Sequence, residues 1–205
     1  MTLISISTLQ IVTPSQLQQM FPNVSFAGDF SLVSTAEWAT YGVAPLTYTT
    51  APSSQFYSVA MGTPTANGDG TYSTTWTQTP IELASAQTIV LNNLSSYAQN
   101  LAWADITYNG ATIPTNATCG VIMSHIAAGT ASITFKGDNG VFIQVAPSDA
   151  TAIQTAMANQ LGLAFAVEAQ LTTQINALTT VDDLAAYDIA SSWTTAQAAI
   201  VSAQS

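Results

Sequence analysis

A single basic residue, Lys136, most limits how this chain can fold and what surface it can present. Charged residues make up 6% of the 205 residues, whereas an ordinary soluble domain has about 25%. The chain is nevertheless expected to fold, because 48% hydrophobic and 9% aromatic residues can supply a core. Its surface must then be solvated mainly by Thr, Ser, Asn and Gln. Because net charge keeps proteins apart in solution, such a surface suits a protein that works in an assembly or outside a cell.

The charge balance argues against two classes of partner. One basic residue stands against 11 acidic residues, and the formal net charge is −10. Nucleic-acid binding depends on Lys and Arg neutralising phosphates, and anionic membrane surfaces attract the same cations. We therefore expect neither nucleic acid nor membrane as a partner.

The termini and apolar runs give an expectation about the compartment. No apolar run approaches the roughly 18 residues that a membrane-spanning helix needs. The N-terminus, Met1 to Ser5, lacks the positive region of a secretory signal. Synthesis and folding in a cytoplasm are expected.

Residues 1–80 have the pattern of a small β-rich module. Thr13 can cap a short helix over 14–20, with Pro14 at its first position. The strongest local signal is a hairpin that pairs 55–63 with 71–78 across a turn rich in Gly and Asn. A second short helix over 35–41, ending at Gly42, and a strand over 46–50 are also expected.

Residues 81–104 are expected to form a helix that connects this module to an α+β domain over 105–205. In that domain Asn109-Gly110 predicts a tight hairpin over 106–113. A capped helix to Ala128, a second hairpin and a long helix from Pro147 to about Leu178 follow. The second hairpin pairs 132–135 with 141–145, the long helix has an apolar stripe that includes Phe165, and short helices follow over 181–187 and 194–203. The fold class predicted for the whole chain is α+β.

Each residue that might carry chemistry has a simpler interpretation. His125 is the only histidine and lies mid-helix without an obvious partner, so a surface or hydrogen-bonded core histidine is favoured over a ligand or base. Cys119 is the only cysteine and is interpreted as a small buried hydrophobe. One His and one Cys do not supply the three or four ligands of a zinc site. No metal ion or cofactor is expected.

The acidic and glycine-rich motifs are likewise interpreted as structural. Asp182 and Asp183 precede a short helix, where the dipole favours negative charge. The segments 67–70 and 138–140 resemble fragments of calcium loops, but neither continues with the spaced oxygen ligands and terminal Glu. The chain has no G-x-S-x-G elbow and no phosphate-binding glycine loop. No catalytic residue is predicted, and the chain is not expected to be an enzyme.

The four tryptophans are scattered along the chain, which favours core anchors over an aromatic platform for sugars. A sugar-binding aromatic surface is the alternative interpretation. These residues are Trp38, Trp76, Trp103 and Trp193.

Two ordered stretches resemble sequences of bacteriophage and prophage tail-fibre regions. The first comprises Phe21-Pro22-Asn23-Val24-Ser25-Phe26, then 37–45 with Tyr41-Gly42-Val43-Ala44-Pro45, then Gly70 to Trp76. It is similar to a small N-terminal tail module. The second, from about Asp105 to Trp193, is similar to a phage domain of unknown function that often follows it. Phe135 stands where that family usually has Trp, and the family's usual arginines and lysines are missing.

This resemblance implies a place in the distal phage tail and transfers no catalytic residue. The leading hypothesis is a virion structural protein, a tail fibre or fibre-associated baseplate component, in contact with other tail proteins and in a homo- or hetero-oligomer. Release with virions would then carry the protein out of the host cell. The alternative is a tail-fibre assembly chaperone that assists trimerisation. A sugar-binding or sugar-cleaving receptor module is a third hypothesis.

Overall fold

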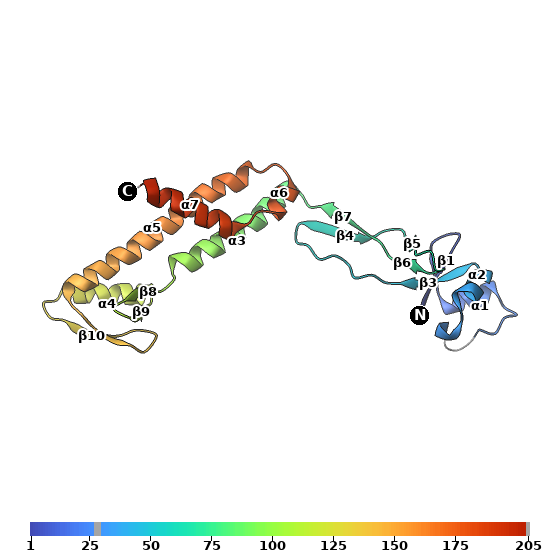
Figure 1. Ribbon diagram of the computed structural model, residues 1–205, viewed down its shortest axis with the longest axis horizontal. Coiled ribbons are helices and arrows are strands. Elements are labelled where there is room, and N and C mark those ends of the chain that lie inside the picture. Colours follow the sequence, from blue (N-terminus) through green and yellow to red (C-terminus); the bar gives the residue numbers. More distant parts are fainter. Residues whose placement is uncertain (27–29, 204–205) are drawn as a thin grey trace. The chain divides into compact units, whose positions relative to one another are not determined.

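Strands and helices both contribute substantially to the chain, in a computed structural model that describes residues 1–26 and 30–203 (Figure 1). The predicted α+β class is confirmed. Contacts divide the chain into a first unit, Met1–Ile81, and a second unit, Glu82–Ser205. The helix expected to connect two domains is an integral part of the second unit. Within the described residues, no helix combines the length and apolar character needed to cross a bilayer.

The first unit is built on a five-stranded sheet in the order β2-β1-β3-β6-β5. β1 pairs antiparallel with β2 and β3, β3 pairs parallel with β6, and β5 pairs antiparallel with β6. The strands are β1 Thr2–Ser5, β2 Ile11–Val12, β3 Val43–Thr47, β5 Thr65–Ala66 and β6 Tyr72–Ser73. The strand expected over 46–50 begins and ends earlier, because Val43, Ala44 and Leu46 are the residues buried against β1.

An aromatic cluster fills one side of this sheet. Phe26 stacks on Trp38 with ring centroids 6.0 Å apart, and Phe30 meets Trp38 edge-on at 5.3 Å. Phe21 and Tyr41 complete the cluster, which packs on Leu3, Val12, Leu17 and Val43. Phe30 lies in the 3₁₀ turn η1 Phe30–Leu32 and Trp38 in α2 Thr35–Thr40, whereas Phe21 directly follows α1 Pro14–Met20 and Tyr41 directly follows α2. The predicted caps are present: Thr13 accepts from the Gln16 backbone, and Gly42 follows α2 with a φ of 69°.

A separate two-stranded ribbon joins β4, Tyr57–Met61, to β7, Trp76–Pro80. The predicted hairpin therefore exists, but its second strand lies closer to the C-terminus than expected. The reason is that β5 and β6, inside the expected turn and second strand, pair with each other and with β3. Buried Thr74 holds this crossing point, since its hydroxyl accepts from the Thr49 backbone N–H at 2.9 Å.

In the second unit, α3 (Leu83–Ala102) packs along α5 (Pro147–Ala177). The buried residues of α3 recur every four positions, which puts them on one ridge: Ala86, Val90, Leu94, Ala98 and Ala102. The buried residues of α5 are Ala150, Ile153, Ala164, Val167, Leu171 and Ile175. The prediction that Phe165 belongs to this stripe is wrong, because its neighbour Ala164 faces inward and Phe165 is 54% exposed.

Neutral amides cap the C-terminal ends of both helices. The Gln160 Nε2 of α5 donates to the carbonyls of Leu101, Ala102 and Ala104 at 2.9, 3.3 and 2.7 Å. The Gln87 Nε2 of α3 donates to the Leu178 carbonyl at 3.3 Å. The last carbonyls of a helix lack intrahelical partners and are often satisfied by cations. Neither helix has a basic residue in its last turn, so glutamines serve instead.

Two tight hairpins, α4 (Ala117–Ala127) and the start of α5 share a second core. The hairpins are β8 Ile106–Tyr108 with β9 Ala111–Ile113, and β10 Ile133–Lys136 with β11 Phe142–Val145. The predicted turn at Asn109 and Gly110 is confirmed, with φ of 48° and 80°. The Asn139 side chain joins the hairpins: its Nδ2 donates to the Gly110 carbonyl at 2.9 Å, and its Oδ1 accepts from the Thr112 N–H at 3.2 Å.

The chain closes with α6, Val181–Ala185, and α7, Ile189–Ala203. α7 begins five residues earlier than the predicted Thr194. Asp188 explains this start, because its Oδ1 accepts from the backbone N–H groups of Ala190 and Ser191 at 3.0 and 3.2 Å. Trp193 of α7 is buried and meets Tyr97 of α3 edge-on at 5.5 Å.

We expect Gln160→Ala to lower the free energy of unfolding by about 1–3 kcal/mol, because up to three carbonyls lose a donor at a partly buried site. Urea denaturation followed by circular dichroism measures the change. Gln170→Ala, at an exposed position of the same helix, is the matched control. Equal stability of the two variants would contradict the capping role.

Asp149 ties the start of α5 to the first hairpin of the second unit. Its Oδ2 accepts from the Ala146 N–H at 3.0 Å, and its Oδ1 accepts from the Tyr108 hydroxyl at 2.8 Å. Both bonds favour the carboxylate, the backbone bond most, and lower the pKa of Asp149. The folded-state pKa is thus below the unfolded value, so the stabilisation is present above about pH 4 and is lost as pH falls further.

Asp149→Asn should therefore flatten the acid limb of the stability curve. We expect the wild type to lose more stability than the variant between neutral pH and roughly pH 3, since only the wild type must protonate this group. Urea titrations across that range measure it. Asp182→Asn, at the exposed start of α6, is the comparison. Parallel curves for wild type and Asp149→Asn would exclude the assigned role.

Candidate functional site

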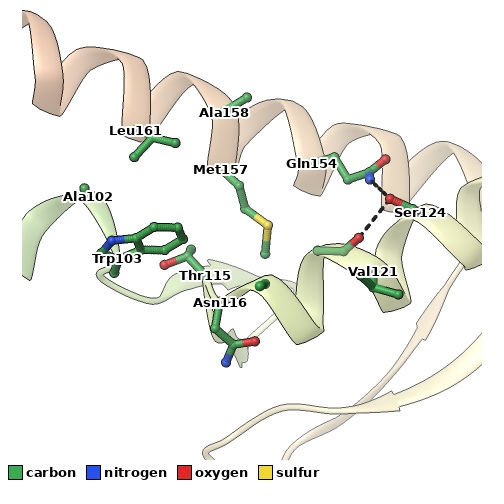
Figure 2. A pocket seen from close by; sticks show the side chains of 12 residues that line it. Ala102, Trp103, Thr115, Asn116, Val121, Ser124, Gln154, Met157, Ala158 and Leu161 are labelled. Carbon is green, nitrogen blue, oxygen red and sulfur yellow. Dashed lines mark hydrogen bonds between the residues drawn. The ribbon is translucent and has the colours of Figure 1, made fainter. Parts of the chain in front are cut away.

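An uncharged pocket of about 380 Å³ opens in the second unit, where the end of α3, the start of α4 and the middle of α5 meet (Figure 2). Its floor and walls are mostly apolar. The lining residues are Ala102, Trp103, Thr115, Asn116, Ala117, Gly120, Val121, Ser124, Gln154, Met157, Ala158 and Leu161. None of these side chains titrates near neutral pH. The pocket therefore has no group for acid–base or nucleophilic catalysis by a positioned ionisable residue.

Trp103 forms one wall of the pocket at the residue that ends α3. Its backbone N–H donates to the Gln99 carbonyl at 3.0 Å, and 55% of its surface is exposed. Figure 2 shows the indole on the α3 side of the pocket, across from Met157 and Leu161 of α5. The prediction of a core anchor is wrong for this tryptophan. The turn after α3 is held by the Gln160 side-chain amide, which donates to the Ala104 carbonyl, and by the Thr115 hydroxyl, which donates to the same carbonyl at 3.0 Å. Neither bond uses the indole of Trp103, so the ring is left free.

Polar groups at the opposite wall are already paired. Gln154 Nε2 donates to Ser124 Oγ at 2.6 Å, and that hydroxyl donates to the Gly120 carbonyl at 2.9 Å. Asn116 uses its Oδ1 to accept from the Cys119 N–H at 2.8 Å. Val121 stands at the rim, 70% exposed. An ion entering this pocket would lose water without gaining an opposite charge, so the site fits a neutral, largely apolar group.

His125 and Cys119, which the sequence interpretation did not favour as ligands, lie in different environments. His125 is exposed in the last turn of α4. Cys119 is 2% exposed and belongs to the core of the hairpins, in agreement with its interpretation as a buried hydrophobe. Burial raises the pKa of its thiol, with a smaller contribution from Asp138, so the thiolate is disfavoured.

The acidic motifs are structural in this fold. Asp182 and Asp183 lie in the first turn of α6, where Thr180 accepts from the Asp183 N–H at 3.1 Å. In the turn 67–70, the Thr71 hydroxyl and N–H donate to Asp69 at 2.6 and 2.9 Å and lower its pKa. Residues 138–140 form the turn between β10 and β11. Within the described ranges, no group of three or more His, Cys, Asp or Glu is placed to hold a metal ion.

The other three tryptophans are not among the residues that line this pocket. Trp38 and Trp193 are 0% and 3% exposed and anchor cores, as predicted. Trp76 is half-buried on β7, and its Nε1 donates to Thr49 Oγ1 at 2.9 Å. Sequence reasoning did not find the pocket, although Trp103 immediately before Ala104-Asp105, where the helical pattern stops, was a usable signal.

Comparison with known proteins gives no relative. No family model, no curated protein and no solved structure matches this chain. The predicted membership of a phage tail family therefore stays a prediction.

Two tryptophan variants distinguish a pocket wall from a core anchor. Trp103→Ala should change the free energy of unfolding by about 1 kcal/mol or less, because the ring is largely solvated. Trp193→Ala should cost about 3–5 kcal/mol, as expected for a deleted core aromatic. Urea unfolding of both variants is the measurement. A large loss in Trp103→Ala would show that the indole supports the fold instead of lining an open site.

Proposed function

We propose that this chain is a structural protein of the bacteriophage distal tail, a fibre or fibre-associated baseplate component, and that it acts by contact with other tail proteins. The observation that carries the proposal is chemical: the candidate pocket contains no ionisable group, and the chain has one basic residue against 11 acidic residues. A molecule of this kind can offer shape and neutral contacts. Its chemistry does not favour turnover or nucleic-acid binding.

The residues that carry the sequence resemblance also support a structural role. Phe21, Phe26, Trp38 and Tyr41 of the first motif lie together in the aromatic cluster of the first unit. In the second stretch, Asn139 reaches the carbonyl of Gly110 and so links two motif turns. The motifs thus coincide with residues that shape the fold, which is what a resemblance between structural proteins requires.

Analysis of purified particles tests the proposal. Mass spectrometry should find this chain in the virion in a fixed ratio to the other tail proteins, and density for it should lie at the distal tail. Particles that lack the chain would reject the structural role. If, in addition, the fibre protein trimerised when expressed with this chain but failed to trimerise when expressed without it, the assembly-chaperone alternative would be accepted in its place.

A charged variant tests whether the pocket takes part. Trp103→Asp should reduce incorporation into particles, because it puts a carboxylate into an apolar contact while leaving the cores intact. The measurement is complementation of a phage that lacks the gene, followed by quantification of the chain in particles. Gln170→Glu adds the same charge at an exposed position of α5 and is the control. Equal incorporation of both variants would remove the pocket from the contact surface.

A further inference from the structure

The β4–β7 ribbon of the first unit has a defined inner and outer set of backbone groups. The N–H of Ile81 donates to the Phe56 carbonyl, and the N–H of Gly62 donates to the Thr75 carbonyl, at 3.0 and 2.9 Å. These pairs share the register that places Val59 opposite Gln78. In an antiparallel ladder the hydrogen-bonded pairs alternate with pairs whose backbone groups point outward. Ser58 and Ala60 therefore bond toward β7, whereas the N–H and C=O groups of Val59 and Met61 point away from it.

The outer edge of β4 is open in the structure. The ribbon contains only two strands, and within the described residues Val59 and Met61 have no backbone partner on that side. The flanking residues Ser58, Ala60 and Met61 are exposed. The outer edge of β7 differs, because it ends in Pro80, which has no N–H to donate. The two edges of the ribbon are thus unequal, because Val59 and Met61 of β4 both have an outward N–H group.

The ribbon also has one apolar face that two strands cannot bury alone. Alternation along the strands puts Tyr57, Val59, Met61, Trp76 and Pro80 on the same face together with one polar residue, Gln78, and Ser58, Ala60, Thr77 and Thr79 on the other. Met61 is 48% exposed. A two-stranded hairpin is marginally stable in water, and a third strand or a helix normally covers it. The helices α1 and α2 of the first unit bury Leu17 and Trp38 in the aromatic cluster instead.

Charge favours a copy of the same chain as the occupant of this edge. A chain with net charge −10 repels its own copies wherever acidic residues face each other. Residues 38–68 and 70–81 contain no charged residue, so the ribbon is a surface where copies meet without that repulsion. Natural edge strands are usually protected from such pairing by Lys, other charges or Pro. β4 has none of these.

We propose that β4 pairs antiparallel with β4 of a second copy, centred on Val59, to form a four-stranded sheet in the order β7-β4-β4-β7. The register is self-complementary, as a twofold interface requires. Val59 of each copy exchanges two backbone hydrogen bonds with Val59 of the other, and Met61 lies opposite Tyr57. The apolar faces of the two ribbons become continuous. The inference goes beyond the proposed function and does not depend on it.

Val59→Pro tests the backbone bonds. Proline removes the outward N–H but leaves the bonds of Ser58 and Ala60 to β7. We expect the full-length wild type to dimerise in sedimentation experiments. The dissociation constant of the variant's dimer should be at least about tenfold higher than that of the wild type. Circular dichroism and urea unfolding establish that the variant is folded. A wild type that stays monomeric up to its solubility limit would overturn the proposal.

A second pair of variants keeps the test decisive if Val59→Pro misfolds. Val59→Lys puts two like charges opposite each other at the twofold axis, where they destabilise pairing. Thr77→Lys adds the same charge on β7, on the other face and away from the β4 edge. The first variant should abolish the dimer and the second should retain it. A dimer that survives Val59→Lys would show that another surface is used.

Oxidation of engineered cysteines locates the register directly. Directly opposed residues of a hydrogen-bonded pair have Cα atoms about 5.5 Å apart, which a disulfide can span. Val59→Cys, in a Cys119→Ser background, should therefore form a covalent dimer, whereas Gln78→Cys on β7 should not. Cross-linking at Gln78 alone would reject the β4 interface. A monomeric chain still present in virions would overturn only this inference, and a dimer absent from virions would overturn only the proposed function.

Discussion

The reciprocal capping of α3 and α5 by glutamine side chains is the interaction on which the second unit depends. Helix ends need donors for their last carbonyls, and proteins commonly supply them with cations. This chain has one cation, and Lys136 lies 5.5 Å from the centroid of Phe142. Gln160 and Gln87 take the role instead, each reaching from one helix to the end region of the other. Because the amides fix both ends, the small residues along α3 can stay in register with α5.

The same substitution of neutral for charged groups appears in the first unit. Thr74 and Thr49 bind each other through hydroxyl and backbone atoms where the chain passes from the sheet to the ribbon. Such bonds are short-range and directional and are less sensitive to salt than surface ion pairs. The carboxylates are used as helix caps and turn acceptors, as Asp149 and Asp188 illustrate.

The parts of the fold that sequence predicted are those set by local chemistry. Thr13, Asn109-Gly110 and Pro147 determine caps and turns within a few residues, and the structure has each of them. The errors arise where contacts between residues far apart in the sequence determine the position of a strand or the orientation of a side chain. β7 is displaced because β6 pairs with β3, and Phe165 is outward because α3 selects Ala164 and Val167 of α5. The pocket was missed for the same reason, since Gln160, more than fifty residues away, fixes the turn that exposes Trp103.

A low charge has different consequences at the pocket and at the ribbon, and together these consequences limit what the protein can bind. At the pocket, uncharged walls select against ions and favour an apolar group of a partner. At the ribbon, an uncharged edge exposes backbone donors whose geometry is the same in every copy, so it recognises another strand whatever its side chains. Specificity at such an edge must come from register, and the proposed register centred on Val59, the middle residue of β4, is the one that pairs the whole length of the strand in both copies. Lack of charge alone would not favour pairing with a second copy. The edge of β4 is suited to it because its outward backbone groups are also complementary to those of its own copy.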